Sequence, residues 1–441
     1  MKKKVSLFCS ALLLALGSAA LAGCNGDGKV HVKFWHTMGQ ANQELLDRMI
    51  TQFNEIYPDV VIEHSAQGDY AALYEKLNSA IPAGTMPTMA YCYPDHVADY
   101  MSSNAIVNIQ DYLDDEKLAF NSDDGLLSDF TDAYWKEGTE YQKEGIYSVP
   151  FAKSTEVLFY NKTFFDDNGL TVPTTWDEMW ALCQNIKENI MTQPKYKDIE
   201  FPLGYDSDSN LFITMCEQRN LPYTTNKNVK VASDHIQFNN AQTKAMAEEL
   251  VGYMNKGYFL TKGCLPTNAY TSTYFTEGKI VMSIGSTGGT SYQTTTNFTV
   301  AVAPAPVTDE NSTYVSQGPS ICFFKKGNQA QKEAAWNFYK FITRAFNTAA
   351  YSALTGYEPV RKSAYEVPTY KEYLKGTSLQ AQTSATTATI AGKYFTSAVF
   401  NGSATARDQV GNIFALMYVN KYSADKAFAE AYSKTVDATK L

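Results

Sequence analysis

Apolar residues follow two alternating periods between residues 30 and 92. Three short apolar or alternating runs predict strands, namely Val30–Trp35, Val60–Ile62 and Met89–Cys92. The segments 45–57 and 70–81 between them repeat apolar residues every three or four positions, which predicts helices that prolines end. Strands and helices that alternate with short links predict a mainly parallel sheet flanked by helices, and therefore an α/β protein.

The same alternation resumes later in the chain. Further strands are predicted at 156–160, 279–284, 298–302 and 321–324, and helices begin after Thr175 and cover 329–344. Thr175 is a candidate N-cap, because its hydroxyl can accept from the first free backbone amides. The last hundred residues read as helical, apart from a predicted Ser/Thr/Ala-rich loop at 376–389.

The N-terminus has the pattern of an export signal. Three lysines precede an apolar run from Val5 to Leu16, and small residues follow as far as Leu21-Ala22-Gly23-Cys24. The last four residues resemble a bacterial lipobox, which implies a signal peptide at 1–23 and diacylation of Cys24; an ordinary signal with an incidental cysteine is the alternative. Residues 24–29 then form a tether. We expect the protein to be lipid-anchored on the extracellular or periplasmic face of the cell membrane.

Composition narrows the classes of function. The chain has 441 residues and a formal charge of −9, which loss of residues 1–23 with their three lysines lowers to −12. This length suits two or three domains, and the negative charge argues against a nucleic-acid partner. Five cysteines after the lipobox are scattered singly, at 92, 183, 216, 264 and 322. We interpret them as small core residues rather than as one disulfide with leftover thiols.

An ordered set of motifs carries a family resemblance. The motifs are Phe34-Trp35-His36-Thr37-Met38, Phe53-Asn54-Glu55-x-x-Pro58-Asp59, Pro150-Phe151, Leu158-Phe159-Tyr160-Asn161-Lys162, Pro173-x-Thr175-Trp176-Asp177-Glu178, Phe275-Thr276-Glu277-Gly278-Lys279, Gly318-Pro319-Ser320 and Thr355-Gly356-Tyr357-Glu358-Pro359-Val360. Together, over about residues 30–435, they resemble family 1 of the extracellular solute-binding proteins of ABC importers. The branch they resemble contains glycerol-3-phosphate-binding and sugar-binding proteins.

The resemblance implies a type II periplasmic-binding-protein fold, in which two α/β lobes joined by hinge strands close over a solute. By analogy the chain crosses between lobes near 152–155, 285–288 and 342–346. The first lobe would then hold 30–152 plus 286–343, and the second 153–285 plus 344–441. The resemblance also implies delivery of the solute to the transmembrane permease subunits of an importer. We expect a monomer.

The resemblance also implies a set of ligand-binding residues. Matched to positions of this chain, they are Trp35, Tyr70, Ser154, Ser286, Gly318, Tyr357 and Arg407. The acidic residue of the family pattern falls at Pro94, so the neighbouring Asp95 is the candidate to contact hydroxyl groups. That departure leaves the identity of the ligand open.

Each candidate also has a structural interpretation. The Arg407 guanidinium suits a phosphate or paired hydroxyls, or else forms a salt bridge with a neighbour such as Asp408. Ser286 lies in a glycine-rich turn that either binds a ligand or is a plain hinge. The rings of Tyr70 and Tyr357 suit the face of a sugar, although tyrosine is common in this chain. The structural alternatives are a core position for Trp35 and a helix cap for Asp95. Lys153 is either a solvated charge or a second cation for a phosphate.

Signs of catalysis or metal binding are weak. The five histidines lack metal-ligand spacing, and Gly285-Ser286-Thr287-Gly288 is not a hydrolase elbow. The run Asp206-x-Asp208-x-Asn210 starts like a calcium loop but has Leu211 where glycine is needed, so we interpret it as a solvated turn. We expect no cofactor, no metal and no catalytic residue.

The sequence therefore predicts a lipoprotein that captures a carbohydrate-class solute for an importer. Arg407, Ser154 and Ser286 favour glycerol 3-phosphate or a related phosphodiester, whereas Pro94 and the many aromatic residues favour a neutral sugar or oligosaccharide. The alternative from another class is a surface lipoprotein that degrades glycans or acts as an adhesin.

Overall fold

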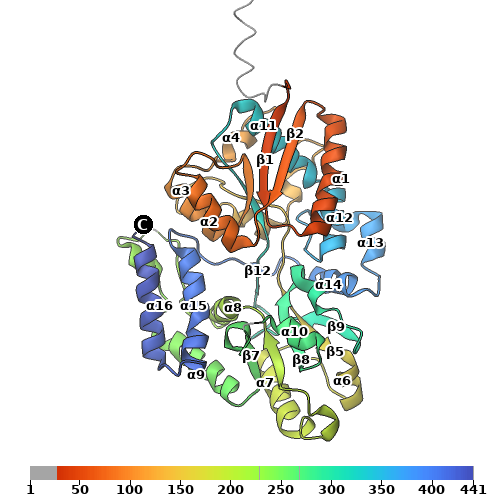
Figure 1. Ribbon diagram of the computed structural model, residues 1–441, viewed down its shortest axis with the longest axis vertical. Coiled ribbons are helices and arrows are strands. Elements are labelled where there is room, and N and C mark those ends of the chain that lie inside the picture. The colour runs from red at the N-terminus through yellow and green to blue at the C-terminus, as the bar shows by residue number, and fades with distance from the viewer. Residues whose placement is uncertain (1–26, 228, 268, 441) are drawn as a thin grey trace, which may run out of the picture.

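The computed structural model describes residues 27–227, 229–267 and 269–440. The predicted signal peptide, Cys24 and the first part of the tether lie outside the described residues. The described chain forms two bodies, each built around its own five-stranded sheet (Figure 1). We call the body around the first sheet the first lobe and the other the second lobe. None of the described helices has the length and apolar character needed to cross a bilayer.

The sheet of the first lobe has the strand order β2-β1-β3-β11-β4. Its strands are β1 (Val30–His36), β2 (Val60–Ala66), β3 (Met89–Cys92), β4 (Val149–Pro150) and β11 (Ser320–Phe323). β1 pairs in parallel with β2 and β3, and β11 runs antiparallel to both β3 and β4. The strands predicted at 30–35, 60–62, 89–92 and 321–324 are therefore confirmed to within a few residues.

The sheet of the second lobe has the order β7-β6-β8-β5-β9. Its strands are β5 (Glu156–Asn161), β6 (Phe201–Tyr205), β7 (Phe259–Thr261), β8 (Ile280–Ser286) and β9 (Val300–Pro304). β6 pairs in parallel with β7 and β8, and β5 is antiparallel to β8 and β9. Both sheets are thus mixed, with one antiparallel strand among parallel ones, which agrees with the predicted α/β class.

Helices cover both sheets. Around the first lie α1 (Gln40–Ile56), α2 (Tyr70–Ala80), α3 (Pro94–Ser102), α4 (Gln110–Leu113), α5 (Asp132–Glu137), α11 (Gln329–Ile342), α12 (Ala345–Thr355) and α13 (Pro368–Tyr373). The apolar stripe of α1 buries Leu45, Leu46, Met49 and Phe53 against the core. Amphipathic spacing thus turns one face of the helix toward the sheet.

The second lobe is covered by α6 (Lys162–Asn168), α7 (Trp176–Asn185), α8 (Asp208–Gln218), α9 (Ala241–Asn255), α10 (Thr271–Thr276), α14 (Leu379–Ala388), α15 (Ser403–Tyr418) and α16 (Ala424–Ala438). Thr175 caps α7 as predicted. Its hydroxyl accepts from the Glu178 amide, and the Glu178 carboxylate accepts in return from the Thr175 amide. This capping box satisfies two backbone donors at once.

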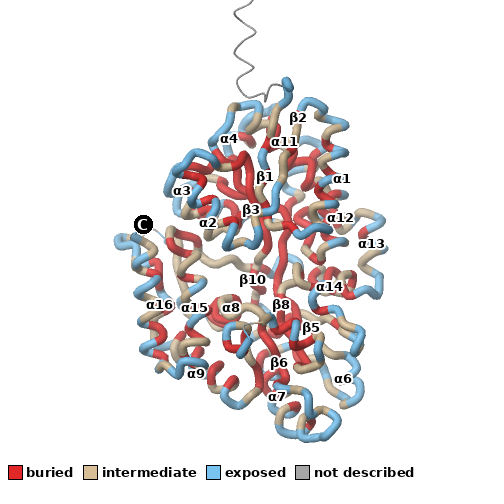
Figure 2. Tube along the Cα trace, in the orientation of Figure 1, coloured by how far each residue is buried: buried red, intermediate tan, exposed pale blue. Residues whose placement is uncertain are grey.

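Buried residues concentrate in the strands and on the inner faces of the helices (Figure 2). The five cysteines after the lipobox are all buried and unpaired with one another in disulfides. Their predicted role as small core residues is confirmed.

Sheet pairing corrects the predicted boundary at 286. β9 pairs with β5 in the second sheet, so the chain does not leave the second lobe at 285–288. It re-enters the first sheet only with β11. Five residue pairs between β5 and β9 fix this placement. The turn after β8 gives no sign in the sequence of which sheet the next strand joins. The boundary at 344 shifts as well, because α12 packs against α1 and α11 of the first lobe as well as against α14.

The predicted loop at 376–389 is also wrong, since residues 379–388 form α14. Ser378 caps this helix by accepting from the Ala381 amide at 3.2 Å. Buried threonines satisfy their hydroxyls within the helix, as Thr383 does by donating to the Leu379 carbonyl at 2.9 Å. Packing against β9 and α12 outweighs the low helix propensity of serine and threonine.

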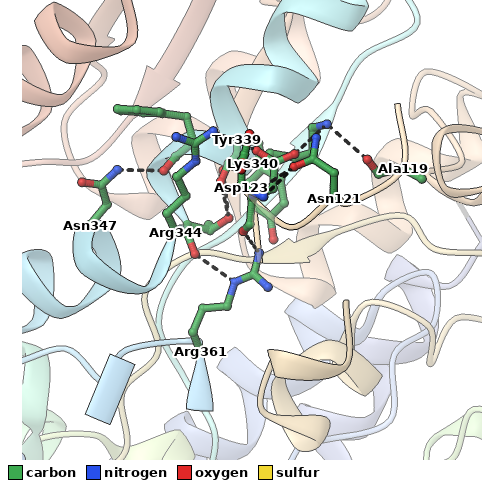
Figure 3. A network of polar contacts seen from close by, with 11 residues as sticks. Ala119, Asn121, Asp123, Tyr339, Lys340, Arg344, Asn347 and Arg361 are labelled. Carbon is green, nitrogen blue, oxygen red and sulfur yellow. Dashed lines mark hydrogen bonds and ion pairs between the residues drawn. The ribbon is translucent and has the colours of Figure 1, made fainter. Parts of the chain in front are cut away.

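A polar network anchors the segment 119–129 of the first lobe (Figure 3). The Arg361 side chain is fully buried and donates to the carbonyls of Thr343, Asp124 and Leu126 at 2.7–3.0 Å. Its guanidinium also lies 3.8 Å from the centre of the Phe130 ring. Each nitrogen of this buried guanidinium thereby donates a hydrogen bond, as the burial of a cation requires.

The segments that join the lobes meet side by side. Lys153 forms a bridge with Glu358, and Ser154 forms one with Gln317. A two-stranded parallel sheet of β10 (Tyr314–Val315) and β12 (Tyr394–Phe395) lies between the lobes (Figure 1). We call this group of crossing segments the hinge.

Candidate functional site

Two adjoining cavities lie between the lobes. The larger has a volume of about 1090 Å³ and the smaller about 440 Å³. They share five lining residues, which are Tyr93, Ser207, Tyr270, Gln317 and Asp408. Because of these shared residues we treat both cavities as one site and call it the cleft.

The cleft lies where parallel strands end. Tyr93 follows β3 in the first lobe, whereas Asp206 follows β6 and Lys262 follows β7 in the second, and Ser286 ends β8. Open α/β sheets characteristically bind ligands beyond the carboxyl ends of their strands, where loops are free to vary. The position of the cleft therefore follows from the topology of the two sheets.

Most of the predicted site residues come together in the cleft. Ser154, Ser286 and Tyr357 line the larger cavity, and Tyr70, Asp95, Gly318 and Arg407 line the smaller one. They come from segments separated by more than 300 residues in the chain. Their contact with a ligand stays a prediction.

Trp35 is not among the residues that line either cavity. Its ring packs against the core of the first lobe, and the Lys76 ammonium lies 4.6 Å from the ring centre. The structure thus places the partly buried Trp35 against the core, with a cation–π contact to Lys76.

Lys153 is neither a solvated charge nor a free cation for a phosphate. Its side chain is fully buried, and its ammonium lies 2.5 Å from a Glu137 carboxylate oxygen and 3.1 Å from the Ser320 hydroxyl. This ammonium is unavailable to a ligand, because leaving Glu137 would leave a buried charge unpaired.

Gly318 has a steric role in the hinge. Its φ is +87°, and a Cβ atom there would lie 2.3 Å from the Ala152 carbonyl oxygen. Glycine alone allows this backbone conformation and this close approach. The residue lets two hinge segments touch beneath the smaller cavity.

Arg407 contacts an amide rather than a neighbouring carboxylate. Its guanidinium donates to the side-chain oxygen of Asn210, which also accepts from Gln317 at 3.0 Å. Asn210 in turn donates to the Glu156 carboxylate at 2.7 Å. The predicted alternative of a salt bridge to Asp408 is not what the structure shows, and Asn210 joins both lobes' hinge segments to Arg407.

Glu156 is the buried acid of this network. Its side chain is 3% exposed and accepts from the Tyr205 hydroxyl as well as from Asn210. Removal from water raises the pKa of this carboxyl to about 7, against the opposing effect of its hydrogen bonds. Burial likewise raises the pKa of Asp95 to about 6, although the nearby Arg407 opposes the shift.

Aromatic rings form much of the apolar surface of the cleft. Tyr70 and Tyr93 stack with their ring centres 4.2 Å apart. Tyr270 and Tyr292, from the second lobe, are 56% and 74% exposed although both line the larger cavity. Flat rings that face an open cavity are suited to the apolar face of a sugar ring.

Several lining residues were not predicted from the sequence, foremost the run from Asp206 to Asn210. We interpreted it as a solvated turn, yet it lines the larger cavity. It covers the end of the link from β6 and the first turn of α8. Asp206 accepts from the Thr271 amide and hydroxyl at 2.6 Å, and Asp208 accepts from the Gly263 amide at 2.9 Å. The available signal was its place directly after an apolar strand.

The carboxylates of Asp206 and Asp208 are held by hydrogen bonds from other segments of the second lobe. No group of three or more His, Cys, Asp or Glu side chains within 27–227, 229–267 and 269–440 is arranged to hold a metal ion. The donors that hold Asp206 and Asp208 are amides and a hydroxyl. The chemistry available in the cleft is therefore hydrogen bonding, ring stacking and charge.

Comparisons with known proteins agree with this geometry. The model of the family described as bacterial extracellular solute-binding protein matches residues 48–377. The sn-glycerol-3-phosphate-binding periplasmic protein UgpB of Escherichia coli K12 is 26% identical over 378 residues, which cover 82% of this chain and 81% of that protein.

Solved structures share the fold over almost the whole chain. UgpB from Mycobacterium tuberculosis, in complex with glycerophosphocholine, has a TM-score of 0.74 at 19% identity and covers 94% of this chain and 100% of that one. The GacH receptor of Streptomyces glaucescens, solved without ligand and with acarbose, has a TM-score of 0.73 at 17% identity, covering 93% and 98%. The predicted two-lobe type II fold is confirmed by this likeness.

Proposed function

The chain belongs to the bacterial extracellular solute-binding proteins, and we propose that it captures a carbohydrate-class solute between its lobes for the permease of an ABC importer. The solute is a sugar, an oligosaccharide or a glycerol phosphate. The observation that carries the proposal is the cleft itself, which adjoins both sheets and combines tyrosine rings with polar side chains.

Capture depends on the relative stability of open and closed arrangements. A solute that contacts both lobes favours the closed arrangement, and a permease that prefers that arrangement then receives loaded protein. The hinge supports such motion because a few crossing segments connect the lobes. In this role the chain binds the solute and breaks no bond in it.

The proposal includes attachment to the membrane. Acylation of Cys24 and removal of residues 1–23 would tether a monomer to the outer face of the membrane that the permease spans. The Leu21-Ala22-Gly23-Cys24 pattern supports this. A Cys24→Ala variant should lose incorporation of a labelled fatty acid and leave the membrane fraction.

A ligand screen tests the function. Neutral sugars, oligosaccharides, glycerol 3-phosphate and glycerophosphodiesters are added to the purified protein, and thermal unfolding is followed. A ligand at one hundred times its Kd stabilises the folded state by about 2.7 kcal/mol. We expect a shift with at least one compound, a more compact outline by small-angle scattering and recovery of the compound unchanged. Release of a cleaved product would favour the glycan-degrading alternative.

A further inference from the structure

The cleft is strongly acidic. Its acidic lining residues are Asp69, Asp95, Glu137, Glu156, Asp206, Asp208 and Asp408, and its basic ones are Lys262 and Arg407. An ionised carboxylate only accepts hydrogen bonds. The lining therefore offers many acceptors and few donors to a bound solute.

Some of this charge is already balanced within the protein. Glu137 pairs with Lys153, and Glu156 is held by Tyr205 and Asn210. Asp69 accepts from a backbone amide at the start of α2. These acids contribute less to the field that a solute meets in the cleft.

The two basic residues are engaged as well. Arg407 donates to Asn210, and the Lys262 ammonium lies 3.8 Å from the centre of the Tyr270 ring. Asp95 lies close enough to Arg407 for their charges to affect each other. Lys262 acts to lower the pKa of Asp206 and of Asp208, and Arg407 acts likewise on Asp408, but burial outweighs these cations and leaves the pKa of all three carboxyls raised.

The remaining carboxylates face the larger cavity. Asp206 and Asp208 accept from neighbouring backbone amides, but no cation pairs with either within the described chain. Asp408 lines both cavities and is exposed. Burial raises the pKa of Asp206 and of Asp208, which means that the charged form is under-compensated there.

Two buried side-chain oxygens beside the larger cavity also lack a hydrogen-bond donor among the described residues. Gln293 lines the larger cavity, is 2% exposed, and its amide oxygen has no hydrogen-bond partner in the described structure. One oxygen of Asp208 is also buried without a partner. Buried polar atoms are normally paired, so these acceptors favour a guest that brings donors.

We propose that the solute captured in this cleft carries a protonated amine, as an amino sugar does, and this inference rests on the proposed capture of a carbohydrate. An ammonium group brings three donors and a positive charge to Asp206, Asp208 and Asp408. A phosphate brings only acceptors and a like charge, which these carboxylates oppose. The sugar hydroxyls and ring face still suit the tyrosines.

The test uses sugars that differ at one position. Glucose, N-acetylglucosamine and glucosamine, with their β-1,4-linked dimers, carry a hydroxyl, an acetamide or an ammonium at C2. Affinities are measured by calorimetry at pH 6.5, alongside maltose, maltotriose and glycerol 3-phosphate. We expect the amine-bearing sugar of a matched set to bind at least tenfold more tightly than its neutral partners.

Variants then locate the charge. Asp408→Asn should weaken binding of the amine-bearing sugar at least fivefold more than binding of its neutral partner. Asp208→Asn should do the same, which guards against a folding defect in one variant. Asp425→Asn makes the same charge change on exposed α16, away from the cleft, and should change neither affinity.

The outcomes separate this inference from the proposed function. A neutral sugar that binds as tightly as its amine-bearing partner, or tighter, overturns the amine and leaves carbohydrate capture standing. Tight binding of glycerol 3-phosphate also overturns the amine and leaves the proposed capture standing. If neither a sugar nor a glycerol phosphate binds, the proposed function fails together with the inference.

Discussion

The two lobes share a sheet plan but supply different chemistry to the cleft. In each sheet the first three parallel strands are ordered second, first, third along the chain, followed by an antiparallel strand and an edge strand. The first lobe contributes the stacked pair Tyr70 and Tyr93, whereas the second contributes the acids and amides at Asp206–Asn210. Strand topology thus fixes where a site lies, and the residues after the strands decide what it binds.

The largest expected effect lies at the hinge between the lobes. Gly318→Ala should lower the free energy of unfolding by about 3 kcal/mol, because a Cβ at positive φ meets the Ala152 carbonyl. The control is Gly392→Ala, which has φ +85° but nothing within 4 Å, so its cost should be about 1 kcal/mol. Urea unfolding measures both. Equal losses would contradict a steric role for Gly318.

The next effect tests the polar contribution of the second lobe. Asn210→Ala removes the partner of Arg407 and of Glu156, so it should cost about 2 kcal/mol of stability. It should also weaken solute binding about tenfold. Asn189→Ala, on an exposed helix end that touches no cleft residue, should change stability by less than about 0.5 kcal/mol. Unchanged solute affinity of the Asn210 variant would show that this network does not contribute to solute binding.

Aromatic contributions from the two lobes can be compared directly. Tyr93→Ala should raise the solute Kd about tenfold, because the Tyr70 ring also loses its stacking partner. Tyr292→Ala removes one exposed ring of the second lobe and should raise it about threefold. Phe346→Ala, an exposed aromatic on α12, serves as the control in calorimetry. A larger increase in Kd for Tyr292→Ala than for Tyr93→Ala would mean that the second lobe supplies the main stacking surface.

The smallest effect concerns pH. Burial raises the pKa of Glu156 to about 7, so the folded state holds this proton more tightly than the unfolded chain does. Its stabilising effect is full below the unfolded pKa of about 4.3 and is lost as pH rises towards 7. Between pH 6 and 7 the protein should lose about 1 kcal/mol more stability than its Glu156→Gln variant. Parallel stability curves would show that Glu156 keeps an ordinary pKa.

The prediction of elements from the sequence succeeded where burial follows a local period. The apolar stripe of α1, the apolar runs of β1, β3 and β8, and the capping signal at Thr175 are all patterns of neighbouring residues. The prediction failed at α14, and it placed the correctly predicted strand β9 in the wrong lobe, because both outcomes depend on partners distant in the chain. The Ser, Thr and Ala residues of α14 form a helix because β9 and α12 pack against them. No repeating pattern in the sequence of this segment indicates that packing.

The sequence by itself determined the α/β class, the family resemblance and seven of the residues that line the cleft. It did so because strand periods, caps and short motifs are local properties. Only the tertiary structure decided that Trp35 is packed, that Lys153 is neutralised by Glu137, and that Asp206 and Asp208 line the cleft. Those outcomes depend on which distant side chains share a low-dielectric space, and the folded chain alone brings them together.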